Sequence, residues 1–244
     1  MLNSFAEPVD ALVVGAGGGI GGAFVDHLLA DECVRSVRAW SRSGLEKSHA
    51  KLQTRCLDVG NESELQEASS EADRLTLVII ATGVLHGAGG MVPEKSWKSI
   101  DPTVMAESFR VNAILPTMIL KYLIPRVPRK ERAILCALSA RVGSISDNRL
   151  GGWHSYRASK AALNQIIQSF SIELKRTHPE AACLGLHPGT VDTDLSAPFQ
   201  TSLAGNHQLF SPSQSAEHLL NVIDAATPAN SGCLIAWDGK KIDP

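Results

Sequence analysis

The sequence predicts an α/β fold in which helices cover both faces of a mainly parallel, doubly wound sheet. Short apolar runs alternate with helix-like patterns along all 244 residues. The run 75–81 consists largely of Leu, Val and Ile, which is typical of a strand buried on both faces. No linker, low-complexity tract or internal repeat divides the chain, so we expect one domain spanning residues 1–244.

Seven strands and five helices are expected from these patterns. The strands are expected at residues 11–14, 34–40, 51–57, 75–81, 132–138, 181–186 and 233–237. The helices are expected at residues 23–30, 61–72, 102–123, 155–174 and 213–226, with a kink at Pro116 in the third. In such a fold, ligands bind where the carboxyl ends of the strands meet.

Composition argues against several classes of partner. The formal net charge of −2 gives no electrostatic basis for binding nucleic acid or an anionic membrane surface. The five cysteines are scattered and form no Cys-x-x-Cys, and no His-Glu-x-x-His occurs, so we expect free thiols and no metal site. The longest apolar run, 75–85, is too short to cross a bilayer, and residues 1–10 lack a secretory signal pattern. A cytoplasmic location is therefore expected.

The glycine-rich stretch after the first strand predicts a dinucleotide site. Glycines let the backbone approach a pyrophosphate, and the following helix offers free N–H groups and a favourable dipole. The stretch fits G-x-G-x-x-G through Gly17, Gly19 and Gly22. It equally fits G-x-x-x-G-x-G through Gly15, Gly19 and Gly21.

The end of the second strand indicates which cofactor is bound. Here an acidic residue would bind the ribose 2′-hydroxyl of NAD, and a basic residue suits the 2′-phosphate of NADP. The strand is followed by Ser41 and Arg42, with no carboxylate before Glu46. We therefore expect NADP (NADPH).

Tyr156 and Lys160 are four residues apart in a helical pattern, so their side chains lie on one face. A nearby ammonium lowers the pKa of a phenol, which would suit Tyr156 to acid–base catalysis. Alone, such a pair is roughly ten times more often a packed Tyr and a solvated Lys than a catalytic pair, and it is the rest of the chain that favours the catalytic interpretation. Several polar or small residues follow the predicted strands and should share one crevice: Ser41, Arg42, Asp58, Thr82, Gly83, Ser139 and Pro188.

The glycine loop, a mid-helix Asn, a strand-end Ser and Tyr-x-x-x-Lys occur in this order. The chain thereby resembles the short-chain dehydrogenase/reductase family over nearly its whole length, especially the carbonyl reductase subgroup of sniffer and C-factor-like proteins. The resemblance implies a Rossmann-type fold, the second glycine register, and the catalytic residues Ser139, Tyr156, Lys160 and Asn112. The cofactor contacts that it implies, together with the strand-end residues above, are Gly15, Gly17, Gly19, Ile20, Gly21, Ser41, Arg42, Asp58, Val59, Ala81, Thr82, Gly83, Asn112, Tyr156, Lys160, Pro188, Gly189, Val191 and Thr193.

The serine departs from the family pattern. In the family it lies three residues before a glycine, and counting back from Gly143 gives Ala140. The nearest hydroxyls belong to Ser139 and Ser144. We assign the role to Ser139 because it lies where the strand ends, with Ser144 as the competitor.

The resemblance implies hydride transfer between NADP(H) and a small carbonyl or alcohol substrate. The alternatives are a cofactor-binding signalling or regulatory protein on the same fold, and a serine hydrolase, which the lack of Gly-x-Ser-x-Gly disfavours. The substrate pocket is expected from the loops 83–101, 144–153 and 196–212. A homodimer or homotetramer formed through the two long central helices is also expected from the resemblance.

Overall fold

The computed structural model describes residues 1–87, 91–198 and 208–244. An eight-stranded sheet forms its centre in the order β10-β9-β6-β5-β4-β1-β2-β3. Its strands are β1 (Val9–Val14), β2 (Val34–Ser41), β3 (Leu52–Cys56), β4 (Leu77–Ile80), β5 (Ala133–Leu138), β6 (Ala181–His187), β9 (Leu234–Ala236) and β10 (Lys241–Ile242). A separate pair joins β7 (Thr190–Val191) to β8 (Leu209–Phe210) in parallel.

The predicted doubly wound α/β fold is confirmed. Strands β3 to β6 and β9 extend the parallel sheet, and only the last pair, β9 with β10, is antiparallel. The sheet has one strand more than the seven expected, because β10 has two residues and is too short to produce a pattern.

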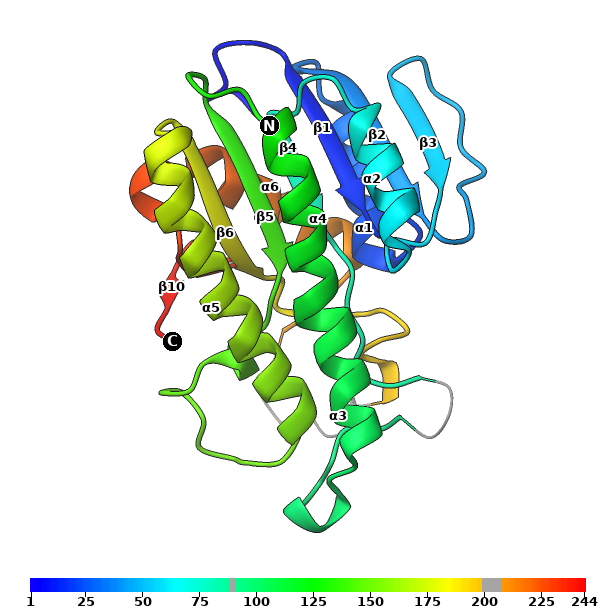
Figure 1. Ribbon diagram of the computed structural model, residues 1–244, viewed down its shortest axis with the longest axis vertical. Helices are drawn as coiled ribbons and strands as arrows, with labels where there is room; N and C mark the ends of the chain where they lie inside the picture. The colour runs from blue at the N-terminus through cyan, green and yellow to red at the C-terminus, as the bar shows by residue number, and fades with distance from the viewer. Residues whose placement is uncertain (88–90, 199–207) are drawn as a thin grey trace.

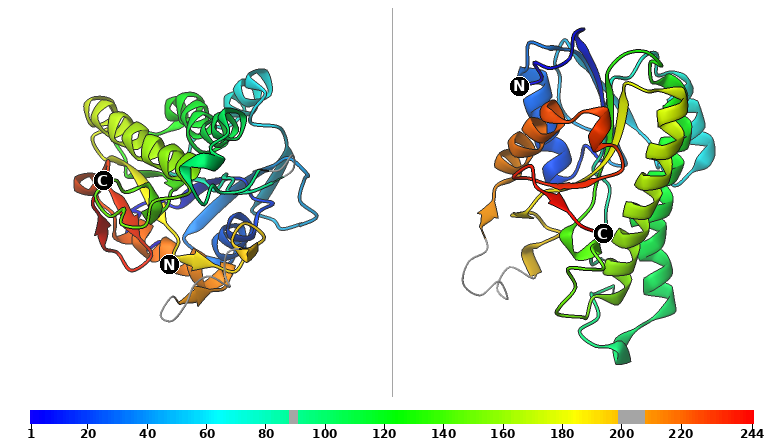
Figure 2. Two further views of the ribbon diagram at one scale, coloured as in Figure 1. Left: turned by 90° about the horizontal axis from the view of Figure 1, so that it is seen from below. Right: turned by 90° about the vertical axis from the view of Figure 1, so that its left-hand side faces the viewer.

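Helices cover both faces of the sheet (Figures 1 and 2). The helices are α1 (Gly19–Ala30), α2 (Glu62–Ser70), α3 (Pro102–Phe109), α4 (Leu115–Leu123), α5 (His154–Thr177) and α6 (Pro212–Ala225). Short 3₁₀ turns are η1 (Trp97–Ser99), η3 (Ile124–Arg126), η4 (Arg141–Gly143) and η6 (Pro228–Asn230). Helices α1 and α6 lie on one face, and α2, α4 and α5 on the other.

Alternate residues of the central strand enter two separate cores. Ala11 and Val13 of β1 pack in the core with α1 and α6. Leu12 and Val14 pack in the core beneath α2, α4 and α5. All four side chains are at most 1% exposed, as expected of a strand with helices on both sides.

The helix expected at 102–123 is interrupted. A π-turn, η2 (Arg110–Ile114), separates α3 from α4, and the Leu115 N–H donates to the Arg110 carbonyl. Pro116 explains the interruption, because it has no N–H and its ring crowds the carbonyl four residues earlier. The expected kink is thus a widened turn, and it contains Asn112.

In Figure 1 the parallel strands point downward, and the N-terminal parts of α3 and α5 extend below the carboxyl ends of these strands. The functional groups predicted from the sequence come from loops, helix starts and the π-turn on this carboxyl-end side of the sheet. None of the helices in the described ranges is both long and apolar enough to span a bilayer.

Candidate active site

The glycine loop has the second of the two predicted registers. Gly15 has a φ of 86°, in the left-handed region that favours glycine, and its N–H donates to the Trp40 carbonyl at 2.9 Å. A Cβ at Gly21 would overlap the Gly15 carbonyl oxygen, whereas one at Gly22 would meet nothing closer than 3.4 Å. Gly15, Gly19 and Gly21 are therefore the glycines that the loop requires.

The loop lies against two other predicted segments. A Cβ at Gly19 would be 2.8 Å from Thr193 Cγ2, and one at Gly15 would be 3.0 Å from the Ala81 carbonyl carbon. Residues that follow β1, β4 and β6 thus meet at one place. The other predicted contacts lie along the same edge, namely Gly17 and Ile20 at the start of α1, Asp58 and Val59 after β3, Pro188 and Gly189 after β6, and Val191 in β7.

Two buried hydroxyls at this edge fit a polar ligand. Ser41, at the end of β2, and Thr82, after β4, each have a hydroxyl oxygen that is inaccessible and has no hydrogen-bond partner within the described ranges. Such orphaned groups are costly unless a ligand or water satisfies them. Arg42 follows Ser41 and is exposed, so its guanidinium is free to meet an anionic group.

Tyr156 and Lys160 occupy the first two turns of α5. The Lys160 side chain is buried, its Nζ donates to the Leu138 carbonyl at 2.8 Å, and it lies 5.7 Å from the centre of the Tyr156 ring. Burial lowers the pKa of Lys160 to about 8. Burial also raises the pKa of Tyr156 to about 12.

The pKa of Tyr156 is raised, whereas the sequence predicted that the neighbouring Lys160 would lower it. The cause is burial, which disfavours the charged phenolate. Tyr156 is therefore protonated at neutral pH, which is the form that donates a proton.

Asn112 is fully buried within the π-turn. Its Nδ2 donates to the Val84 carbonyl at 2.9 Å and to Ser159 Oγ at 3.1 Å, and its Oδ1 accepts the Val84 N–H at 2.8 Å. A Cβ at Gly83 would be 3.5 Å from Asn112 Oδ1 and 3.6 Å from Lys160 Nζ. The glycine therefore keeps a narrow space open between the amide and the ammonium.

Both candidate serines are engaged in holding the fold. The Ser139 hydroxyl donates to Asn164 Oδ1 at 2.6 Å, and the side chain is buried against α5. The Ser144 hydroxyl donates to the Asp243 carbonyl. Ala140 continues the extended backbone with φ −153° and ψ 149°, so its methyl leaves the strand on the side opposite Ser139. In this conformation Ser139 has no proton free for a substrate oxygen.

Three residues near the pair were not predicted from the sequence. Ser159 and Asn164 bind the predicted residues Asn112 and Ser139. Ser159 lies three residues after Tyr156 and Asn164 four residues after Lys160, and these helical spacings could have placed both on the face of the catalytic pair. Glu94 contacts the start of α5 from the loop after β4, and no local pattern indicates a contact over 61 positions.

The predicted substrate loops are described in part. Residues 88–90 and 199–207, including Phe199, lie outside the described residues. Trp97, in the first loop, is 71% exposed. No group of three or more His, Cys, Asp or Glu side chains that could hold a metal occurs within the described ranges.

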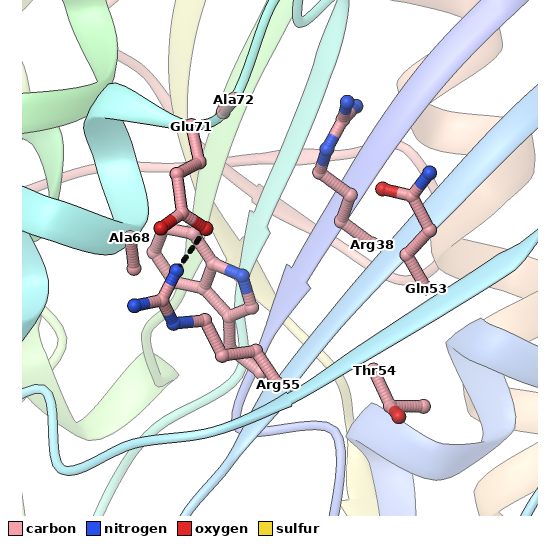
Figure 3. A pocket seen from close by; sticks show the side chains of 8 residues that line it. Arg38, Gln53, Thr54, Arg55, Ala68, Glu71 and Ala72 are labelled. Carbon is pink, nitrogen blue, oxygen red and sulfur yellow. Dashed lines mark hydrogen bonds and ion pairs between the residues drawn. The ribbon is translucent and has the colours of Figure 1, made fainter.

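A cleft of about 400 Å³ lies elsewhere, between α2 and the β2–β3 edge (Figure 3). Arg55, on its floor, is ion-paired with Glu71 across it. Its charged groups are already paired and it contains none of the predicted catalytic residues. We therefore place the site at the strand ends, where the chemically suitable groups converge.

Comparison with known proteins establishes the family. The short chain dehydrogenase model matches residues 10–204, so the chain belongs to this family. It is 35% identical over 156 residues to 1-hydroxy-2-glutathionyl-2-methyl-3-butene dehydrogenase of Rhodococcus sp. (strain AD45), covering 64% of this chain and 65% of the relative. The match thus spans less than two thirds of that relative. It is 32% identical over 144 residues to C-signal of Myxococcus xanthus, covering 59% of this chain and 80% of the relative.

Solved structures have the same fold. The carbonyl reductase Sniffer of D. melanogaster superposes with a TM-score of 0.81 at 20% identity, covering 96% of this chain and 99% of that one. An NADPH-bound carbonyl reductase from chicken fatty liver has a TM-score of 0.82 at 24% identity, covering 99% and 97%. The prediction of a short-chain dehydrogenase/reductase is confirmed.

Proposed function

We propose that this protein is an NADP(H)-dependent oxidoreductase that interconverts a carbonyl compound and an alcohol, with Tyr156 as general acid and base. The observation that carries the proposal is that Lys160 Nζ lies near the Tyr156 ring and, together with Asn112, borders the space left at Gly83. The NADPH-bound relative and the exposed Arg42 support NADP(H) as the cofactor.

The bound nicotinamide would supply the hydride, and the protein would manage the proton and the developing charge. Tyr156 is protonated at neutral pH and would donate its proton to the substrate oxygen as negative charge develops there. Lys160 would stabilise the phenolate left on Tyr156 and hold ribose hydroxyls with its ammonium. Asn112, across the space at Gly83, would link Lys160 to solvent through water.

The test is the Tyr156→Phe variant, which removes the phenolic proton and little else. We expect NADPH binding to be retained and carbonyl reduction to fall by about a thousandfold, within the usual range for general acid catalysis. NADPH oxidation across a panel of aldehydes and ketones measures the rate, and fluorescence titration measures binding. Near-normal reduction by this variant would disprove the role of Tyr156.

One observation favours a second function, a cofactor-binding signalling or regulatory protein. Ala140 occupies the position of the family serine, and the hydroxyls of Ser139 and Ser144 are engaged elsewhere. Similarity to C-signal is consistent with this alternative. Tight NADPH binding without consumption of NADPH across the whole panel would favour it over the enzyme.

A further inference from the structure

Glu94 is a buried carboxylate in the loop between β4 and α3, with a relative exposure of 3%. Burying a carboxylate is costly unless charge or hydrogen bonds compensate it. Within the described ranges no Lys, Arg or His forms an ion pair with Glu94. Its two oxygens instead accept the Ser155 N–H at 3.3 and 3.2 Å, and the Ser155 hydroxyl donates to Oε1.

These contacts cap a helix that has no cap of its own. The residue before α5, Trp153, has φ 51° and ψ 41° and makes no side-chain capping bond. Its N–H donates to the Glu94 carbonyl at 2.6 Å, so both the main chain and the side chain of Glu94 hold this helix start. A carboxylate at a helix N-terminus satisfies free N–H groups and interacts favourably with the dipole.

The capped turn is the one that carries the proposed acid. Tyr156 directly follows Ser155, and its ring packs edge-on against Trp153, with centroids 6.2 Å apart. Lys160 is fixed separately, one turn later, by its bond to the Leu138 carbonyl. Fraying of the first turn would therefore move Tyr156 while Lys160 stayed in place.

We propose that Glu94 is a positioning residue. It holds the first turn of α5 in place and so fixes the position of the Tyr156 hydroxyl relative to Lys160. The proposal rests on the function proposed above. It also joins the loop after β4 to the catalytic helix, since a Cβ at Gly152 would be 3.3 Å from the Glu94 carbonyl oxygen. The loop after β4 and the start of α5 are thus expected to move together.

The experiment compares Glu94→Ala and Glu94→Gln with Asn61→Ala. Asn61 is a matched control because its exposed side chain caps α2, with Oδ1 accepting the N–H groups of Ser63 and Glu64 at 3.1 and 3.4 Å. The measurements are kcat and KM for NADPH-dependent reduction of the panel aldehyde that wild type reduces fastest, NADPH affinity by fluorescence, and amide hydrogen exchange over residues 154–158.

We expect Glu94→Ala to lower kcat at least about tenfold, because small displacements of a catalytic group have effects of this size or larger. NADPH affinity should stay within about twofold, since the cofactor-holding Lys160 is anchored independently. Exchange at 154–158 should rise about tenfold, the size expected for a lost cap. Glu94→Gln keeps an acceptor and should rescue part of both effects, and Asn61→Ala should leave both unchanged.

Unchanged exchange at 154–158 in Glu94→Ala would overturn the proposal, as would equal losses of kcat in the Glu94 and Asn61 variants. If Glu94→Ala does not fold, Glu94→Gln is the decisive variant, with smaller shifts in the same directions. Failure of the proposed function can be told apart from failure of this inference. If Tyr156 were not the acid, Tyr156→Phe would leave turnover unaffected, whereas hydrogen exchange in the Glu94 variants would still show whether Glu94 caps α5.

Discussion

Ser139 and Ala140 are adjacent on one extended strand end, and their side chains leave it on opposite sides. The Ser139 hydroxyl is bound to Asn164, and Asn164 Nδ2 in turn donates to the Gly143 carbonyl at 3.5 Å. This chain of contacts holds the strand end and the η4 turn against α5. A proton donor on the Ala140 side would not disturb it.

Ala140→Ser should therefore raise the rate of carbonyl reduction, by about tenfold or more, because an oriented donor to a developing oxyanion is worth about a hundredfold where it is native. Ser139→Ala should lower the rate chiefly by loosening Asn164. Steady-state kinetics with NADPH measures both variants. A rate for Ala140→Ser equal to wild type, with a loss of a hundredfold or more in Ser139→Ala, would return the role to Ser139.

We propose that the preference between the two cofactors also depends on a single residue. Arg42 is exposed directly after β2, and we expect NADPH to bind more tightly than NADH because the guanidinium can pair with the 2′-phosphate. Arg42→Ala should lose most of this preference, at least about tenfold in the ratio of dissociation constants. Fluorescence titration with both cofactors tests it, with Arg149→Ala, another exposed arginine, as the control. Equal affinities in the wild-type protein would contradict the assignment.

At the scale of elements, the amino ends of three strands are joined by one buried carboxylate. Asp10 of β1 accepts from Arg35 and from Ser36 Oγ (2.8 Å) of β2, and from Arg74 Nη1 (2.9 Å) just before β4. Burial alone would raise the pKa of the Asp10 carboxyl, but these hydrogen bonds outweigh it and hold the pKa below its ordinary 3.8.

Asp10→Asn should lower the free energy of unfolding at pH 7 by about 2 kcal/mol, a typical value for charged hydrogen bonds. A carboxyl whose pKa is lowered by folding stabilises fully above its unfolded pKa and loses that contribution as the pH falls through its folded pKa. The difference between wild type and variant should thus be constant from pH 7 to 5 and shrink below 3.8. Urea unfolding at several pH values measures it.

Asp73→Asn is the control, since Asp73 is 93% exposed in its ion pair with Arg38 and should change stability little. If the difference in unfolding free energy between wild type and Asp10→Asn grew as the pH fell, the pKa of Asp10 would be raised and not lowered by folding.

How much of the fold can be predicted from the sequence depends on the length of each helix or strand. Long apolar runs reveal the parallel strands to within a few residues, whereas β8 and β10, with two residues each, give no periodic signal. The glycine pattern alone fits two registers; the family resemblance implies the second, and the close approach of Gly21 to the Gly15 carbonyl supports it. The Ser139 bond to Asn164 and the Glu94 cap join chain segments that folding brings together. Helical spacing could place Asn164 on the face of Lys160, but no local pattern identifies Ser139 as its partner or Glu94 as the cap.

At the scale of the whole molecule, α4 and α5 form an outer layer on one face of the sheet (Figure 2). Ile114, in the π-turn, is 52% exposed, and Ile172, on α5, is 50% exposed. The homodimer or homotetramer expected from the family resemblance would cover both side chains if it formed through this layer, and we propose this arrangement for test.

Ile172→Asp should shift the native mass toward the monomer, because a buried unpaired charge at a helix–helix interface costs several kcal/mol. Light scattering coupled to gel filtration measures the mass. Leu150→Asp is the matched control, since Leu150 is 91% exposed on the loop before α5, outside the helical layer. A monomeric wild-type protein would rule out the homo-oligomer, and an Ile172 variant that keeps the wild-type mass would place the interface elsewhere.

The widened turn at Arg110–Ile114 also fixes how far α4 is rotated about the helix axis relative to α3. One residue corresponds to about 100° of rotation about a helix axis. Helix α3 packs against α5, whereas α4 also packs against α2, so the two parts present different sides to their neighbours. Deleting one residue from this turn would swing the Asn112 carboxamide away from Val84 and Ser159 without altering its chemistry. The number of residues in the turn is therefore constrained as strictly as their identity.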